Sequence, residues 1–312
     1  MSHTGLGVRL MIALALGSCS RSTVTTDPSA SGVTSLPRPE IQIKYGPSPL
    51  EFGHLRLPNG PKPYPVVLFI HGGCWLSRWD IQHVSALEVA LAGAGYAVWS
   101  LEYRRIGDDG GGWPNTFNDI AHGADYLRVL APTHGLDLSR LVASGHSAGG
   151  ELALWLAARR KIPTTSELFM ADPLAIQGVL ALAPAADLES LSTSDGCGGA
   201  VLSLMGGTKA TRAERFLAAS PMDLAPLGVP ETVVVGARDD TWTPIARAYV
   251  DHARALGDTG LEVVVAPEAG HFELIDPDSS TWPRIVDAYR TLFVRMKTLS
   301  KAPGRNYRSV WP

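Results

Sequence analysis

The segment from Leu141 to Arg160 limits the fold of this chain more than any other stretch. It begins with the strand-like residues Leu-Val-Ala-Ser, continues as Gly145-His-Ser-Ala-Gly-Gly150 and then becomes typical of a helix. A tight turn between a buried strand and a helix needs small neighbours, because a Cβ on either side would collide with the adjoining strand or helix. A glycine-rich turn alone could fit this pattern by chance, but the flanking strand and helix favour a nucleophile elbow with Ser147 as the nucleophile.

The rest of the chain alternates between predicted strands and predicted helices. Ile41 to Tyr45 and Leu50 to Leu57 alternate in polarity and predict two antiparallel edge strands. Further strands are expected at residues 65–70, 96–101, 141–144, 178–183, 232–236 and 261–266, and helices near 81–92, 116–130, 151–160, after Pro244 with Thr243 as its cap, and 280–299. This order predicts an α/β fold over residues 40–299, with a mostly parallel sheet of about eight strands and helices on both faces.

Composition excludes several other classes of protein. The chain has 312 residues, of which 45% are hydrophobic and 18% are charged, as in an ordinary globular protein. Its net charge of −3, without a basic cluster in the body of the chain, argues against nucleic-acid binding. The cysteines Cys19, Cys74 and Cys197 lack the spacing of a structural zinc site, and whether Cys74 and Cys197 pair stays open.

Residues 1–19 have the features of an export signal. Arg9 precedes an apolar run from Leu10 to Leu16 that is too short to span a membrane. The sequence Leu16-Gly-Ser-Cys19 resembles the lipobox of bacterial lipoproteins, in which the cysteine is acylated. A plain cleaved signal or a buried helix is the alternative. We therefore expect a cell-envelope protein that is anchored through Cys19, or a periplasmic or secreted one.

Two further segments lie outside the predicted domain. Residues 20–39 are rich in Ser, Thr and Pro with almost no large apolar residues, so we expect a flexible linker. Residues 300–312 form a short basic tail to which we assign no role.

His271 is the preferred general base for Ser147. A free serine hydroxyl is a weak nucleophile and needs a base to take its proton. His271 follows the last predicted strand after a glycine, whereas His71 lies in the first loop and His146 beside the nucleophile, where its side chain is expected to point away. The order serine, acid, histidine along the chain also favours His271.

A carboxylate is needed to orient the base and to stabilise its protonated form. Asp239 and Asp240 follow the strand at 232–236 and precede His271, but adjacent aspartates cannot both face one imidazole. We prefer Asp239 and expect Asp240 to serve in the loop, with Asp187 after the preceding strand as a remaining candidate.

Backbone amides are the expected donors to the oxyanion. One is Ala148, which follows the nucleophile, and the others are Gly73 and Cys74 in the glycine-rich loop His71-Gly-Gly-Cys-Trp75. Glycines often follow strands simply because they form turns. This loop indicates an oxyanion site only because the elbow, the acid and the base accompany it.

These motifs together resemble the serine hydrolases of the α/β-hydrolase fold, and more narrowly the bacterial esterases and kynurenine-formamidase-like members with HGG-x-W and G-x-S-x-G signatures. The resemblance covers about residues 40 to 299 and includes Tyr103-Arg104, Trp113-Pro114, Gly236-Ala-Arg-Asp239 and Gly270-His-Phe272. The segment from Gly236 to Pro244 is one residue longer than the family's Gly-x-x-Asp-x-x-Val-Pro. Counting from its two ends gives Asp239 and Asp240 respectively, so the acid remains open between them.

The expected function is hydrolysis of a small-molecule carboxylic ester through an acyl-enzyme, with no metal or organic cofactor. An amidase of the arylformamidase or peptidase type would use the same residues, and a non-catalytic binding protein is the alternative from another class. Residues 184–230 are expected to form an irregular cap insertion that meets the loop around Trp113. Trp75, Trp113 and Trp242 lie near strand ends, where each could contact an apolar substrate or pack the rim.

Overall fold

The structure is a computed structural model that describes residues 41–194 and 197–299. The predictions for the export signal at 1–19, the linker at 20–39 and the tail at 300–312 lie outside the described residues. No helix in the described ranges is long and apolar enough to cross a membrane.

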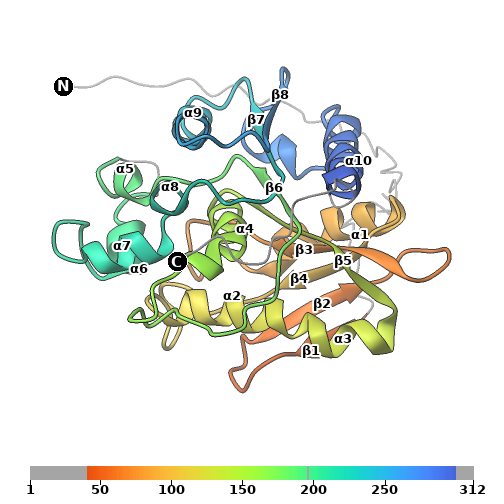
Figure 1. The fold of residues 1–312 in the computed structure, drawn as a ribbon, viewed down its shortest axis with the longest axis horizontal. Coiled ribbons are helices and arrows are strands. Elements are labelled where there is room, and N and C mark those ends of the chain that lie inside the picture. The colour runs from red at the N-terminus through yellow and green to blue at the C-terminus, as the bar shows by residue number, and fades with distance from the viewer. Residues whose placement is uncertain (1–40, 195–196, 300–312) are drawn as a thin grey trace, which may run out of the picture. The chain divides into compact units, whose positions relative to one another are not determined.

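Eight strands form one sheet in the described part of the chain, in the order β1-β2-β4-β3-β5-β6-β7-β8 (Figure 1). β1 and β2 pair antiparallel and β2 joins β4 antiparallel, whereas β3 to β8 pair in parallel. The predicted, mostly parallel sheet is therefore confirmed. The strands are β1 (Ile41–Lys44), β2 (Phe52–Arg56), β3 (Tyr64–Ile70), β4 (Ala97–Leu101), β5 (Leu136–His146), β6 (Gly178–Leu182), β7 (Glu231–Gly236) and β8 (Leu261–Ala266).

Helices cover both faces of this sheet (Figure 1). α1 and α10 lie on one face, and α2, α4 and α9 lie on the other. The inner strands β4, β6 and β7 are buried along their whole length, which explains their apolar composition. The helices that pack on the sheet are α1 (Ser85–Gly93), α2 (Asn115–Asp125), α3 (Leu127–His134), α4 (Ala148–Ala158), α9 (Trp242–Ala255) and α10 (Trp282–Leu299).

The prediction of one continuous helix near 116–130 is wrong, because two helices, α2 and α3, meet at Tyr126. At this junction the amide of Val129 donates to the carbonyl of Tyr126, three residues earlier, at 2.8 Å. Such a bond closes a tighter turn than the α-helical bond to the fourth residue back.

The predicted cap of α9 is also wrong. The helix begins at Trp242, before Thr243, and the hydroxyl of Thr243 donates to the carbonyl of Gly236 at 2.7 Å instead. The amide of Trp242 donates to Oδ1 of Asp239 at 2.9 Å. Asp239 thus satisfies an amide at the start of this helix and is itself held in place.

The insertion at 184–230 is more regular than expected. Its described residues contain four short helices, α5 (Leu188–Ser192), α6 (Ala200–Met205), α7 (Ala213–Ala219) and α8 (Pro221–Leu224). The amide of Trp113 donates to the carbonyl of Leu204 at 2.9 Å, so the insertion meets the loop around Trp113. Large buried side chains such as Leu204 and Phe216 give it regular packing that the irregular composition did not predict.

Candidate active site

Ser147 lies at the turn between β5 and α4, at the carboxyl edge of the sheet. Its backbone has φ 57° and ψ −119°, a left-handed conformation that is rare for a residue with a side chain. A Cβ built on Gly145 would lie 2.1 Å from the carbonyl oxygen of Gly149, and one built on Gly149 would lie 2.1 Å from that of Ile70. The elbow closes tightly only because both positions are glycine.

The loop after β3 packs directly against this elbow. A Cβ on Gly72 would lie 2.6 Å from the carbonyl oxygen of His146 and 3.2 Å from Cβ of Ser147. In the described part of the chain, the backbone amides of Gly73 and Cys74 donate to no acceptor. Ala148 is the first residue of α4, where amides have no partner within the helix. Three unpaired amides therefore belong to segments that adjoin Ser147.

His271 and Asp239 form a close pair. Nδ1 of His271 lies 2.7 Å from Oδ2 of Asp239, and these side chains are 15% and 4% exposed. Burial raises the pKa of Asp239, but the hydrogen bonds from His271 and from the amide of Trp242 outweigh burial and leave that pKa below its usual value. Asp239 is therefore held as a carboxylate beside the ring.

The other two acid candidates lie apart from this pair. Asp240 is exposed. The side chain of Asp187 accepts a hydrogen bond from the amide of Ser190 at 3.1 Å and caps α5. The structure brings neither residue to His271.

His146 links the elbow to the loop that carries His271. Its Nε2 lies 3.0 Å from the carbonyl oxygen of His271, and the two rings are 4.3 Å apart. The side chain of His146 therefore contacts the loop that carries the candidate base. Burial lowers the pKa of His146 well below its usual value, so its neutral ring donates Nε2–H to that carbonyl. No hydrogen bond reaches the Ser147 hydroxyl from the described residues, and such contacts often form only when substrate binds.

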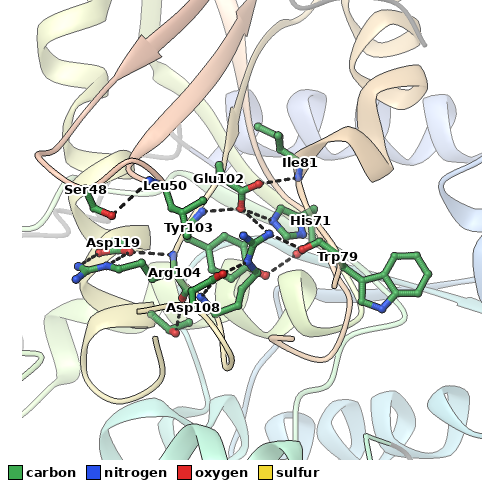
Figure 2. A network of polar contacts seen from close by, with 12 residues as sticks. Ser48, Leu50, His71, Trp79, Ile81, Glu102, Tyr103, Arg104, Asp108 and Asp119 are labelled. Atoms are coloured by element: carbon green, nitrogen blue, oxygen red, sulfur yellow. Dashed lines mark hydrogen bonds and ion pairs between the residues drawn. The ribbon is translucent and has the colours of Figure 1, made fainter. Parts of the chain in front are cut away.

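A buried network of polar contacts supports the loop after β3 (Figure 2). His71 is fully buried, and its Nε2 lies 3.2 Å from Oε1 of Glu102. Glu102 also accepts from the amide of Ile81 at 3.0 Å and pairs with Arg105 at 2.9 Å. Arg105 in turn donates to the carbonyl of Trp79. His71 is therefore committed to this network rather than to Ser147.

Two aromatic residues beside the site were missed as site residues. Trp79 packs over Gly73, because a Cβ there would lie 2.4 Å from the Trp79 side chain. The ring of Phe272 lies 6.4 Å from that of Trp79 and 5.2 Å from that of His271, and Phe272 is 53% exposed. Trp79 lies in an irregular loop, so no periodic pattern marked it. Phe272 directly follows the predicted base, which was the one signal available.

Trp75, Trp113 and Trp242, for which the sequence left substrate contact and rim packing open, have different surroundings. Trp75 is fully buried, which excludes direct contact with a ligand in this conformation. Trp242 is nearly buried and stacks on His271 with ring centroids 5.1 Å apart. Trp113 donates from its indole nitrogen to Glu167 at 3.0 Å and lies beneath the guanidinium of Arg215.

Cys74 and Cys197 form a disulfide, which answers the question that the sequence left open. Their sulfurs are bonded and their Cα atoms are 5.5 Å apart. The bond joins the loop after β3 to the insertion, across a sequence separation of 123 residues. Among the described residues, no three His, Cys, Asp or Glu side chains gather as metal ligands.

Known proteins resemble this chain over most of the described domain. Esterase LipC of Mycobacterium tuberculosis is 25% identical over 246 residues, which cover 75% of this chain. The chain spans 60% of the length of that relative.

The fold also occurs in solved structures. Esterase B from Lactobacillus rhamnosis, inhibited by a tributyrin phosphonate, superposes with a TM-score of 0.70 at 22% identity and covers 86% of this chain and 89% of its own. Propionate-bound Est2 from Thermogutta terrifontis has a TM-score of 0.65 at 19% identity, with 82% and 94% covered. At these identities the likeness establishes the α/β-hydrolase fold.

A family model described as BD-FAE matches residues 55–252, which is more than half of the chain. The match includes the elbow, the loop after β3 and Asp239, and it ends before His271. The chain therefore belongs to the BD-FAE family and has the α/β-hydrolase fold.

Proposed function

We propose that this protein is a serine hydrolase that cleaves carboxylic esters through an acyl-enzyme on Ser147. One observation carries the proposal, namely the 2.7 Å pair of His271 and Asp239, in which His271 also bonds through its carbonyl oxygen to His146 in the strained elbow of Ser147. The names of similar proteins, esterase LipC and esterase B, support an ester substrate.

In the first half of the reaction, His271 takes the proton of Ser147 through Nε2 while Nδ1–H donates to Asp239. The serine oxygen attacks the ester carbonyl and forms a C–O bond, and the carbonyl oxygen becomes an oxyanion. The free amides of Gly73, Cys74 and Ala148 are suited to stabilise this charge, and the amino end of α4 adds to the effect.

In the second half, the protonated His271 gives its proton to the leaving alcohol as the C–O bond to that alcohol breaks. The acyl group stays on Ser147. His271 then takes a proton from water, the hydroxide attacks the acyl carbon, and the carboxylic acid leaves as Ser147 regains its proton. No step calls for a metal or an organic cofactor.

The substrate is proposed to be a small ester with an apolar or aromatic group. Trp79 and Phe272 place two large rings beside the proposed oxyanion loop and the proposed base. Amides remain the alternative substrates, because the same serine, histidine and aspartate would attack them.

We further propose that the domain acts outside the cytosol, and that Cys19 can be acylated. The sequence of residues 1–19 supports export, and the disulfide between Cys74 and Cys197 fits an oxidising compartment.

Hydrolysis of p-nitrophenyl acetate, butyrate and octanoate by the wild type and by Ser147→Ala tests the proposed function. We expect turnover in the wild type and a loss of at least about 10⁴-fold in kcat for Ser147→Ala. A variant that kept most of the wild-type rate would refute the role of Ser147. Formyl-aryl amides assayed in parallel measure the preference between esters and amides.

A further inference from the structure

The loop that carries the proposed oxyanion donors has an unfavourable backbone. Gly73 has φ 111°, and the next two residues, Cys74 and Trp75, both have φ 55°. Left-handed backbone is sterically costly for residues with a Cβ, and two such residues in sequence persist only where their surroundings hold them. Contacts of these two side chains should therefore explain how the loop keeps its shape.

The side chain of Cys74 is held by the disulfide to Cys197. Cys197 is buried, and it lies in the insertion close to α6. This covalent bond spans 123 positions of the sequence, and it ties the position of Cys74 to that of the packed insertion. The amide of Cys74 is one of the two proposed oxyanion donors in this loop, so this restraint acts at a donor itself.

The side chain of Trp75 is held by Glu151, in the first turn of α4. The indole Nε1 of Trp75 donates to Oε2 of Glu151 at 3.2 Å, and both side chains are fully buried. Within the described residues, Oε1 of Glu151 has no partner. Burial raises the pKa of Glu151 well above its usual value, against the hydrogen bond from Trp75.

These two contacts attach neighbouring residues of one loop to two separate parts of the molecule. The backbone amide of Glu151 donates to the carbonyl oxygen of Ser147 at 3.1 Å. The contact between Trp75 and Glu151 therefore connects the loop to the helix turn that begins at the nucleophile. We propose that Cys197 and Glu151 are positioning residues, which hold Cys74 and Trp75 so that the amides of Gly73 and Cys74 face the developing oxyanion. This inference rests on the proposed function, because the oxyanion forms only if Ser147 attacks the carbonyl carbon of a substrate.

Oxyanion donors stabilise the transition state more than the bound substrate. Loosening either contact should therefore lower kcat and leave KM nearly unchanged. It should also lower, by a similar factor, the affinity for a trifluoromethyl ketone that forms a tetrahedral adduct with the serine. A merely structural role would lower the fraction of active protein, which titration with a fluorophosphonate measures separately.

The first test removes the disulfide from the full-length protein. Two samples lack the bond: Cys197→Ser, and wild type reduced with a phosphine. Mass spectrometry of the Cys74 peptide, which should carry a free thiol, shows when the reduction is complete. Each sample should lose about 10- to 100-fold in kcat per titrated site. KM should stay within about threefold. The phosphine should leave Cys197→Ser unchanged, which controls for other effects of the reagent. Reduced wild type with unchanged kcat and ketone affinity would overturn the role of Cys197.

The second test is a double-mutant cycle on Trp75 and Glu151. Trp75→Phe and Glu151→Leu should each lose about tenfold in kcat, and the double variant should lose little more than either one. Glu151→Gln keeps an oxygen acceptor for the indole Nε1–H, so it should retain at least about a third of wild-type kcat. Additive losses, or a Glu151→Gln variant as impaired as Glu151→Leu, would overturn the role of Glu151.

The wild type separates this inference from the proposed function. Absent hydrolysis and absent fluorophosphonate labelling of wild-type Ser147 would refute the proposed function and, with it, the inference. A hydrolytic wild type whose loosened variants keep their kcat and ketone affinity would refute the inference alone.

Discussion

At the scale of single residues, the site depends on groups held by their neighbours. Asp239 uses Oδ2 for His271 and Oδ1 for the amides of Thr241 and Trp242. Both oxygens are thus occupied, and the carboxylate cannot rotate away from the imidazole without losing a helix contact. Asp240 has the same chemistry but is exposed. Position, rather than residue type, separates the two adjacent aspartates.

Neutralising the two aspartates should have very different effects on hydrolysis. Asp239→Asn should lower kcat/KM by about 10³- to 10⁴-fold, because an amide cannot stabilise the protonated His271 and favours the wrong tautomer. Asp240→Asn should stay within about threefold of the wild type. Steady-state kinetics on p-nitrophenyl butyrate would measure both. The reverse ranking would assign the acid to Asp240.

At the scale of elements, two loops from distant strands meet beside the elbow of Ser147. The loop after β3 carries Trp79 and the loop after β8 carries Phe272, and their rings lie 6.4 Å apart in a stacked arrangement. His83, from the 3₁₀ helix Ile81–Val84, lies 4.7 Å from Trp79 and 6.0 Å from Phe272. These rings form an aromatic border between the proposed oxyanion loop and the proposed base.

Removing these rings should change substrate preference more than catalysis of the smallest substrate. For Trp79→Ala and Phe272→Ala, we expect KM for phenyl butyrate to rise about 5- to 30-fold, because each lost ring contributes about 1 to 2 kcal/mol of apolar contact. For ethyl acetate, kcat/KM should change less than threefold.

Tyr64→Ala provides the control, since Tyr64 is a partly buried aromatic residue at the opposite, amino end of β3. Equal losses on both esters in the Trp79 and Phe272 variants, or a similar shift in Tyr64→Ala, would count against substrate contact.

At the scale of the whole molecule, the sequence predicted the order and type of most elements because buried parallel strands and amphipathic helices have clear patterns. The elbow, His271 and the loop after β3 could be located for the same reason, since each follows a strand. The break at Tyr126 and the helices of the insertion could not, because short elements depend on tertiary packing. The disulfide, Trp79 and Glu151 matter through contacts that join distant segments, and no local pattern records such contacts.

A buried carboxyl far from the site should make the stability of the fold depend on pH. Glu231 lies at the amino end of β7, and Tyr249 donates to its Oε2 at 2.6 Å. Burial raises the pKa of Glu231 to about 8 against this hydrogen bond, with a further increase from Asp258. The folded state therefore holds a proton that the unfolded chain releases near pH 4.5. The resulting stabilisation is complete at low pH and is lost as the pH rises through about 8.

Urea unfolding at about pH 6.5 and pH 9 measures this loss. The wild type should lose about 2 kcal/mol more than Glu231→Gln, which cannot ionise and still accepts a hydrogen bond from Tyr249. Other groups that titrate in this range cancel in the comparison. An equal loss in the two proteins would show that Glu231 is ionised when folded.

The most direct test of the account is to trap the covalent intermediate. Wild-type protein mixed with p-nitrophenyl butyrate and quenched in acid within milliseconds should yield a butyryl group on the peptide that contains Ser147, detected by mass spectrometry. His271→Ala should accumulate far less, because the serine lacks its base. Full turnover with no acylated Ser147 peptide, or with the acyl group on another residue, would contradict the proposed mechanism.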